Sequence, residues 1–219
     1  MIECVNISLS YKDGNVSNRV LSEVNLKINY GENIVLLGPS GSGKSSLMYM
    51  LSGIRQPSSG KILYDGKDMY SMNVDNLALL RRQKFGFIFQ FHFLIPYLRV
   101  MENVLVGAPC INDEYKTRAV DKLKQLGMDK YSNKKIYELS GGQRQRVSIA
   151  RALVSEPDII FADEPTASLD HSNATEIIKI LKTFKSNSTL VIATHDTSVL
   201  NGDERIIRVE NNTAIELKK

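Results

Sequence analysis

Residues 139–170 read L-S-G-G-Q-R-Q-R-V-S-I-A-R-A-L-V-S-E-P-D-I-I-F-A-D-E-P-T-A-S-L-D, and the rest of the chain is organised around this stretch. Its first part, Ser140-Gly141-Gly142, is a glycine-rich turn that opens a predicted amphipathic helix. A helix N-terminus carries unpaired backbone N–H groups and the positive end of the helix dipole, and glycine lets a ligand approach the backbone closely. The turn therefore suits a bound phosphate group.

The second part of the same stretch is an apolar strand that ends in two acids. Residues 159–162, I-I-F-A, predict a short buried strand of a parallel sheet. Asp163 and Glu164 follow at its C-terminal end, where α/β folds place their ligands. One carboxylate can hold Mg²⁺ there, while its neighbour orients or deprotonates a water that attacks a phosphate. Taken alone, the pair could equally be two solvated acids before a turn.

The composition is that of a globular protein. The chain has 219 residues, enough for one sizeable domain with a subdomain, and 42% of them are hydrophobic and 24% charged. The net charge of +4 is mild and no dense Lys/Arg block occurs, so charge gives no reason to expect a nucleic-acid partner. Cys4 and Cys110 lack metal-ligand spacing, which favours reduced and incidental thiols in a cytosolic protein.

The sequence predicts no membrane segment of its own. The N-terminus has no basic region followed by an apolar core, so no signal peptide is expected. No apolar run approaches the ~18 residues that a membrane-spanning helix needs. Any membrane role is therefore expected to come through a partner protein.

A second glycine-rich segment, G-P-S-G-S-G-K-S, occupies residues 38–45. A predicted buried strand at 34–37 precedes it, and a predicted helix that ends near Gly53 follows it. Strand, glycine-rich loop and helix in this order are the context that a phosphate-binding loop of the G-x-x-x-x-G-K-[ST] type requires.

Each polar group of this loop has an expected task. Gly41 and Gly43 permit a backbone nest whose N–H groups point at a β-phosphate. Lys44 supplies a positive charge to the β- and γ-phosphates, and the Ser45 hydroxyl can bind Mg²⁺. The loop therefore predicts a nucleoside triphosphate as the ligand.

The remaining chain alternates strands and helices. Residues 2–11 and 20–29 predict an N-terminal antiparallel hairpin, with Tyr11 at the end of its first strand. His195 directly follows a predicted strand. The other expected elements are strands at 61–64, 85–89 and 189–194, a helix at 75–82, two or more helices within 100–138, and a final hairpin that turns at Asn211-Asn212.

Aromatic residues gather in the segment F-G-F-I-F-Q-F-H-F-L-I-P, at residues 85–96. Their period-2 spacing up to Phe89 fits a strand with a buried face. Beyond Gln90 the apolar residues continue into a Pro-containing loop, and loops normally run over the surface. We therefore expect a partner-binding groove there, the alternative being that these side chains fill the subdomain's own core. His92 is expected to pack or to lie in an interface, not to catalyse.

Taken together, these motifs resemble the ATP-binding subunit of an ABC transporter from end to end. The resemblance is carried by the phosphate loop at 38–45, the L-S-G-G-Q signature at 139–143, I-I-F-A-D-E at 159–164, the D-loop Ser168-Leu169-Asp170, the Q-loop residue Gln90 and the switch histidine His195. The segments F-I-F-Q-F-H-F-L-I-P-Y-L-R-V-M-E-N-V and A-D-E-P-T are similar to the macrolide-export and lipoprotein-release branch (MacB- and LolD-like). The chain departs from that branch at Ala167-Ser168, where a glycine usually comes first.

The resemblance implies an α/β fold. It consists of a P-loop NTPase (RecA-like) core, an N-terminal antiparallel β subdomain and an inserted α-helical subdomain. In a single ABC ATPase domain spanning 1–219, the core and β subdomain take 1–90 and 156–219, and the helical subdomain with the signature takes 91–155.

The resemblance also implies roles for individual residues. Glu164 is the expected base or water-orienting group, and His195 and Lys44 complete the catalytic set. Mg²⁺ is expected on Ser45, Gln90 and Asp163, and Tyr11 is similar to the aromatic residue that stacks on adenine. The expected ATP-binding residues are Tyr11, Gly38, Pro39, Ser40, Gly41, Ser42, Gly43, Lys44, Ser45, Ser46, Gln90, Ser140, Gly141, Gly142, Gln143 and Asp170.

The expected partners are ATP or ADP, a second copy of the chain and a membrane permease. The signature lies on a different lobe from the phosphate loop, so two chains placed head-to-tail about a twofold axis would complete two composite ATP sites at once. A separate transmembrane permease is expected to contact the 91–106 region, which places the chain at the cytoplasmic face of the cell membrane.

Two other functions share some of these features. An FtsE-like ATPase, which regulates a membrane partner without transporting a substrate, would carry the same motifs and the same groove. A soluble ABC protein of translation or DNA repair needs tandem ATPase domains or long coiled-coil insertions, and 219 residues hold neither.

Overall fold

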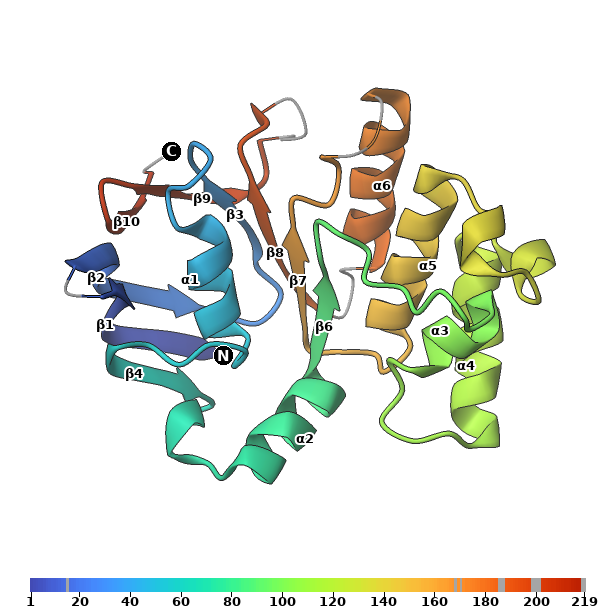
Figure 1. Ribbon diagram of the computed structural model, residues 1–219, viewed down its shortest axis with the longest axis horizontal. Helices are drawn as coiled ribbons and strands as arrows, with labels where there is room; N and C mark the ends of the chain where they lie inside the picture. The colour runs from blue at the N-terminus through green and yellow to red at the C-terminus, as the bar shows by residue number, and fades with distance from the viewer. Residues whose placement is uncertain (15, 168, 170, 185–187, 198–201, 218–219) are drawn as a thin grey trace. The chain divides into compact units, whose positions relative to one another are not determined.

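The computed structural model describes residues 1–14, 16–167, 169, 171–184, 188–197 and 202–217 (Figure 1). The chain forms two compact units, one made of Met1–Ala78 with Val191–Lys219 and the other of Leu79–Leu190. The boundary between the units falls within helix α2 (Val74–Lys84) and within strand β8 (Thr189–Thr194). Among the described residues, no helix is both long enough and apolar enough to cross a membrane.

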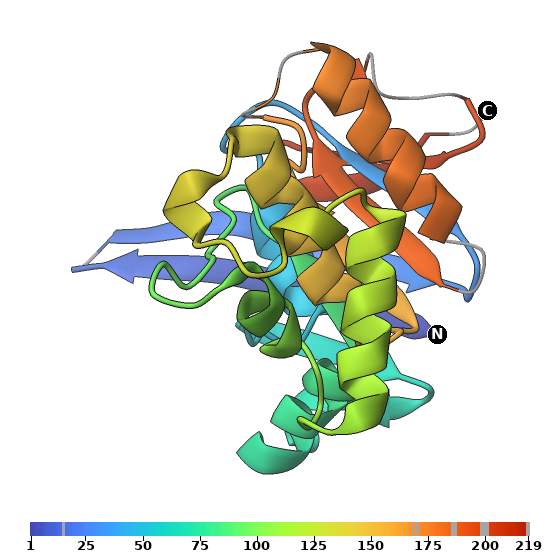
Figure 2. The same cartoon turned by 90° about the vertical axis from the view of Figure 1, so that its right-hand side faces the viewer.

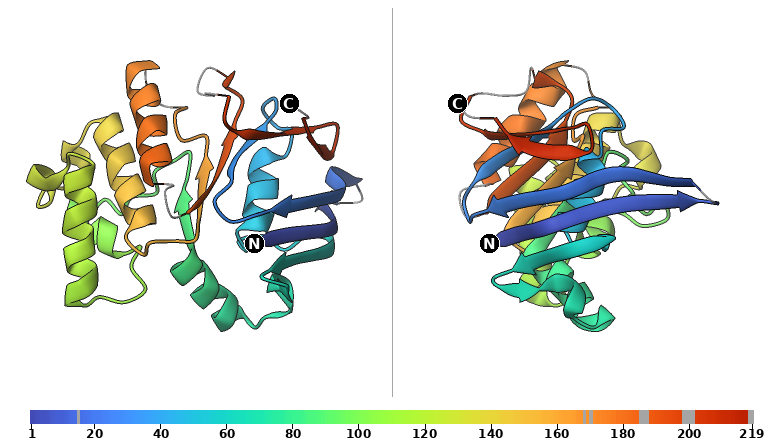
Figure 3. Two further views of the ribbon diagram at one scale, coloured as in Figure 1. Left: turned by 180° about the vertical axis from the view of Figure 1, so that it is seen from behind. Right: turned by 90° about the vertical axis from the view of Figure 1, so that its left-hand side faces the viewer.

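An antiparallel sheet forms one part of the first unit. Strands β1 (Ile2–Asp13) and β2 (Val16–Ile28) pair as the predicted N-terminal hairpin, which Figure 3 shows as a long ribbon. Strand β4 (Ser59–Tyr64) pairs with the other edge of β1, and β5 (Lys67–Asp68) with β4, giving the order β2-β1-β4-β5. The predicted turn at Asp65-Gly66 has positive φ at both residues, as a two-residue hairpin loop requires.

The phosphate loop belongs to the other part of the first unit. Strand β3 (Asn33–Leu37) runs parallel to β9 (Arg205–Glu210), and β9 pairs with β10 (Thr213–Glu216) through the predicted turn at Asn211-Asn212. The strands of this part follow the order β10-β9-β3-β8. Helix α1 (Lys44–Leu51) starts from the loop after β3, and a 3₁₀ turn, η1, spans Met69–Ser71. Side chains on most sides of α1 are fully buried: Leu47, Met48, Met50 and Leu51.

The second unit combines a parallel strand pair with helices. Strand β6 (Phe85–Ile88) runs parallel to β7 (Ile159–Asp163), whose residues are all buried. The helices are α3 (Val100–Leu105), α4 (Asp113–Gln125), α5 (Gly141–Leu153) and α6 (His171–Phe184), with 3₁₀ turns η2 (Asp129–Tyr131) and η3 (Ile136–Glu138). Helices α3, α4 and α5 pack against one another (Figure 2).

Close packing of β6 against α5 depends on a glycine. A Cβ atom on Gly86 would lie 2.4 Å from the carbonyl oxygen of Ala152 at the end of α5. Phe161 on β7 is fully buried and its ring contacts Phe85 and Phe87 of β6. The core of this unit is therefore an aromatic cluster on the strand pair, covered by helices.

The elements expected from the sequence are present, and the longest described element that had not been expected is helix α6. The strands at 34–37, 61–64 and 189–194, the helix at 75–82 and the helix after Ser140 are confirmed. Helix α6 was missed, although its buried residues Ala174, Ile177, Ile178 and Leu181 have helical spacing. The division of the chain at residues 91 and 155 stays a prediction.

The loop after β6 is held by a buried asparagine. Asn103 on α3 is fully buried, and its Oδ1 accepts a hydrogen bond of 2.7 Å from the backbone N–H of Ile95. Its Nδ2 donates to the carbonyl oxygens of Ile95 and Arg99, each at 3.1 Å. One side chain thus binds backbone groups at both ends of the irregular segment between Ile95 and Arg99.

We expect Asn103→Leu to destabilise the protein by about 2 kcal/mol, because the leucine places an apolar side chain where Oδ1 accepted the Ile95 N–H and leaves that N–H without its partner. The midpoint of urea unfolding measures the loss. Asn76→Leu, at an exposed position of α2, is the matched control and should change stability by less than about 0.5 kcal/mol. Equal unfolding midpoints for the two variants would contradict this role for Asn103.

Candidate nucleotide-binding site

The phosphate loop follows a backbone path that requires glycine. Gly41 and Gly43 have φ of 79° and 101°, in the region that side chains disfavour. A Cβ atom on Gly38 would lie 2.2 Å from the carbonyl oxygen of Val209 on β9. The loop therefore runs in direct contact with the neighbouring strand, and the first N–H groups of α1 follow it.

Lys44 lies inside this loop. It is the first residue of α1, it is 5% exposed, and its Nζ donates hydrogen bonds of 2.9 Å to the carbonyl oxygens of Gly38 and Pro39. A buried ammonium needs hydrogen bonds and a nearby negative charge. The position of Lys44 inside the loop therefore suits its predicted role, which is to place a positive charge beside the phosphates of a nucleotide.

The other residues of the loop leave polar groups for a ligand. Pro39, Ser40 and Gly41 are exposed. Ser42 Oγ is buried and has no hydrogen-bond partner among the described residues. Buried hydroxyl groups are usually paired, so this one is consistent with a ligand oxygen in the complete site.

The structure brings Tyr11 to the phosphate-loop helix. The Tyr11 hydroxyl on β1 lies 3.5 Å from Ser46 Oγ on α1, although the two residues are 35 positions apart. The ring is 39% exposed and pairs with the Arg55 guanidinium, whose Cζ lies 4.3 Å from the ring centroid. Tyr11 and Ser46 are thus neighbours, as the prediction of a shared nucleotide site requires.

His195 directly follows β8 in the chain, as predicted. Its side chain is exposed, and the preceding Thr194 is 1% exposed and accepts a hydrogen bond from the Asp196 N–H through Oγ1. The buried threonine fixes the backbone at the end of the strand, from which the imidazole projects.

In the second unit, the acid pair lies at the end of β7. Asp163 is the last residue of the strand and is 2% exposed, whereas Glu164 is half-buried. Glu164 has φ of 44°, an uncommon conformation for a residue with a side chain and one that clusters at functional sites. The two carboxylates therefore have different environments, which favours different roles for them over two equally solvated acids.

The residues after the acid pair are fixed by Gln145. This residue of α5 is 2% exposed, and its Nε2 donates a hydrogen bond of 2.7 Å to the carbonyl oxygen of Pro165. Sequence reasoning missed Gln145, although a glutamine on the buried face of an amphipathic helix is the signal that could have found it. Asp170 and Ser168, both expected in the D-loop, lie outside the described residues.

The signature turn is a capped helix start that lines a hollow. Ser140 Oγ accepts a hydrogen bond from the Gln143 N–H, and Gln143 Oε1 accepts one from the Ser140 N–H. A hydroxyl that accepts one bond still has its proton to donate to a ligand. Ser140 to Gln143 line a cavity of about 520 Å³ together with two cationic residues, Lys130 and Arg146. Its chemistry suits an anion.

The aromatic segment after Gln90 is largely at the surface. Gln90 itself is exposed, and Phe91, Phe93 and Tyr97 are 70%, 63% and 73% exposed. Leu94 and Ile95, which were predicted with them, are half-buried. The three aromatic side chains therefore lie at the surface, as expected for a partner-binding segment. The two aliphatic side chains are partly covered, as the alternative of packing into the subdomain's own core predicts.

Arg151 of α5 holds this segment, and sequence reasoning missed it. Its Nη1 and Nη2 donate hydrogen bonds of 2.7 Å to the carbonyl oxygens of Phe93 and His92. Burial, together with the charges of Arg144 and Arg151, lowers the pKa of His92 below its usual value. This agrees with a packing role for His92.

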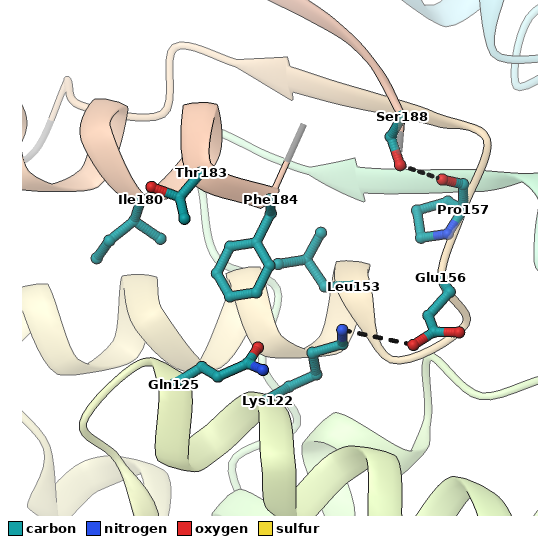
Figure 4. A pocket seen from close by; sticks show the side chains of 9 residues that line it. All are labelled: Lys122, Gln125, Leu153, Glu156, Pro157, Ile180, Thr183, Phe184 and Ser188. Carbon is teal, nitrogen blue, oxygen red and sulfur yellow. Dashed lines mark hydrogen bonds and ion pairs between the residues drawn. The ribbon is translucent and has the colours of Figure 1, made fainter. Parts of the chain in front are cut away.

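A larger cavity in the second unit contains none of the predicted site residues. It measures about 830 Å³ and lies among residues of α4, α5 and α6 (Figure 4). Lys122 Nζ lies 3.6 Å from a Glu156 carboxylate oxygen at its wall, and Ser188 Oγ donates a 2.6 Å hydrogen bond to the Pro157 carbonyl. Cavity size therefore does not identify the nucleotide site in this chain.

Known proteins match the chain along its length. The sequence profile of the ABC transporter family matches residues 21–167. The lipoprotein-releasing system ATP-binding protein LolD of Buchnera aphidicola subsp. Schizaphis graminum is 39% identical over 217 residues, covering 96% of this chain and 94% of that protein. LolD of Leptospira interrogans is 39% identical over 227 residues, covering 100% of this chain and 95% of that protein.

A solved structure matches as well. A dimeric ATP-binding cassette in a post-hydrolysis state, bound to ADP and Pi, has a TM-score of 0.91 and 36% sequence identity, and the match covers 100% of this chain and 98% of that one. This likeness confirms the predicted P-loop α/β fold. On these matches and the phosphate loop described above, the chain belongs to the ABC transporter family and is an ATP-binding, ATP-hydrolysing subunit of it.

Proposed function

We propose that this subunit hydrolyses ATP as a head-to-tail dimer and so drives a separate membrane permease of the lipoprotein-releasing type. The geometry of the phosphate loop carries the proposal, because its glycine-dependent path and its enclosed Lys44 suit the β- and γ-phosphates of ATP. The names of the relatives support the transport type over an FtsE-like regulator.

In the proposed reaction the residues of the acid pair differ in role. Asp163, the buried one, binds Mg²⁺, and Glu164 orients or deprotonates the attacking water. His195 contacts the γ-phosphate and positions that water. Lys44 and the backbone N–H groups of residues 40–46 neutralise the charge that builds up on the phosphates.

The residues proposed for Mg²⁺ fit a hard cation. Asp163, Ser45 and Gln90 offer carboxylate, hydroxyl and amide oxygens, which Mg²⁺ prefers. Within the described residues, no group of three or more His, Cys, Asp and Glu side chains could hold a metal ion by itself. The phosphates of ATP would complete the coordination of an ion held by these side chains.

The signature turn is proposed to bind the γ-phosphate of ATP held by a second copy of the chain. The support is the cavity beside Ser140, Gly141 and Gly142, with its two cationic residues and an available hydroxyl proton. A dimeric cassette among the solved structures supports this assembly. The expected division, with 91–155 as the helical subdomain and 1–90 with 156–219 as the core, is part of the same proposal.

The permease is proposed to bind the exposed aromatic surface formed by Phe91, Phe93 and Tyr97 within the 91–106 region. These side chains follow Gln90 directly, so a change at a Mg²⁺-bound Gln90 would move them. Arg151 and Asn103 attach the segment to α5 and α3, which lets a movement of the loop reach the helices. Binding to a permease would place the chain at the cytoplasmic face of the cell membrane.

For catalysis, we expect Glu164→Gln to bind ATP normally and to lose turnover by about 10²- to 10⁴-fold, because the amide cannot accept a proton from water. Phosphate release and ATP binding measure the two effects separately. Glu156→Gln is the matched control, since Glu156 also has positive φ, at 53°, and lies in the same unit. Near-normal hydrolysis by Glu164→Gln would contradict the assignment.

For the dimer, mixing two inactive variants tests whether sites are shared. Lys44→Ala removes the phosphate-loop charge, and Ser140→Asp keeps a residue that caps helices while placing a carboxylate against the γ-phosphate. A mixed dimer has one intact site and one doubly altered site, so mixing should restore part of the ATPase activity that each variant lacks.

The control mixes Lys44→Ala with a second preparation of Lys44→Ala, which cannot form an intact site. Activity is measured over a range of mixing ratios. If no ratio of Lys44→Ala to Ser140→Asp recovers activity while both variants remain folded, the composite sites are wrong.

For the permease surface, we expect Phe91→Ser combined with Tyr97→Ser to leave the fold and basal ATPase activity intact and to abolish permease-stimulated activity. Interface anchors of this type contribute about 2 kcal/mol or more each. Tyr137→Ser is the control, because Tyr137 is 73% exposed in the same unit. If the double variant unfolds, while the fraction that stays folded still crosslinks to the permease as before, these side chains belong to the core and not to the permease surface.

A further inference from the structure

Arg55 covers the ring of Tyr11, which we propose, from the family resemblance, as the residue that stacks on adenine. The Arg55 Cζ lies 4.3 Å from the centroid of the Tyr11 ring. A guanidinium within about 6 Å of an aromatic centroid is attracted by the negative face of the ring, and its flat shape allows it to stack. Both residues belong to the first unit, so this contact lies within one compact body.

The backbone of Arg55 is anchored, which fixes the point from which its exposed side chain reaches the Tyr11 ring. Its N–H donates a hydrogen bond of 3.0 Å to the Tyr49 carbonyl of α1. The Tyr70 hydroxyl of η1 donates to the Arg55 carbonyl and lies 2.8 Å from the Met50 carbonyl. The turn after α1 is thereby tied to both α1 and η1.

Tyr11 is restrained in the same way from a second side. Its strand position is fixed by pairing with Asn18 of β2, and its hydroxyl lies 3.5 Å from Ser46 Oγ. The ring thus has one face beside the guanidinium and one edge beside the start of α1. It is still 39% exposed, which leaves ring surface on which a base can stack.

We propose that Arg55 is a positioning residue for the adenine base: it fixes the Tyr11 ring so that the base stacks on the opposite face. The inference rests on the proposed role of Tyr11. A ring that is already held in place loses less conformational entropy when a base stacks on it, which strengthens binding. Arg55 acts through the ring and makes no contact with phosphate.

The positive charge of Arg55 could also act directly on the phosphates of a ligand, without the Tyr11 ring, and this alternative predicts a different pattern of ligand affinities. A cation that attracts the phosphates through space would strengthen every phosphate ligand, with or without a base. A cation that acts through Tyr11 strengthens only ligands that stack on the ring. Comparing ADP with inorganic pyrophosphate therefore separates the two effects. Neither ligand has a γ-phosphate, so the proposed hydrolysis consumes neither of them during the measurement.

The test is a double-mutant cycle on the full chain, with dissociation constants for ADP and pyrophosphate measured by calorimetry. We expect Arg55→Ala to weaken ADP binding by about two- to fivefold, the size of an exposed cation–π contact, and to leave pyrophosphate binding unchanged. In a Tyr11→Ala background, Arg55→Ala should have no further effect on ADP. Arg55→Lys, which keeps the charge without the flat group, should recover only part of the ADP affinity.

Lys67→Ala is the matched control, because it removes one exposed positive charge of β5 in the same unit. Equal weakening of ADP by Arg55→Ala in both backgrounds, loss of pyrophosphate affinity, or no change in ADP affinity would each overturn the inference. If Tyr11→Ala itself leaves ADP binding unchanged, the proposed base platform is wrong. If Tyr11→Ala weakens ADP binding and Arg55→Ala does not, only the role of Arg55 is wrong.

Discussion

A Cβ atom at residue 38 would lie 2.2 Å from the carbonyl oxygen of Val209, and the backbone at residues 41 and 43 has positive φ. The loop between β3 and α1 keeps its path only because glycine occupies these positions. That path places the carbonyl oxygens of Gly38 and Pro39 around the Lys44 ammonium and leads into the first turn of α1. The shape of the phosphate loop and the position of Lys44 therefore both depend on backbone positions that only glycine can occupy without strain.

In the second unit, polar side chains hold segments that are neither helix nor strand and that contain proposed site residues. Arg151 and Asn103 bind backbone groups between residues 92 and 99, and Gln145 binds the carbonyl oxygen of Pro165 just after the acid pair. Irregular backbone needs such partners, because its N–H and C=O groups are not satisfied by a regular ladder. The same bonds connect the exposed aromatics and the acid pair to the core helices α3 and α5.

Local patterns predicted most of the elements because the causes are local. Strand β8, helix α5 and the turns at Asp65-Gly66 and Asn211-Asn212 follow from apolar runs, a capping residue and residues that tolerate positive φ. Helix α6 has the same kind of signal in the helical spacing of its buried residues, although it was not predicted.

The sequence by itself determined the phosphate loop, the signature turn and the acid pair, because each is a short run of residues whose chemistry depends on its immediate neighbours. Only the tertiary structure decided which distant residues meet. Tyr11 reaches Ser46 across 35 positions, Arg151 reaches Phe93 across 58, and Arg55 stacks on Tyr11. It also decided that Phe91, Phe93 and Tyr97 are exposed while Phe85 and Phe161 are buried. The physical reason is that such contacts and burial depend on how strands and helices pack, and no local pattern encodes that packing.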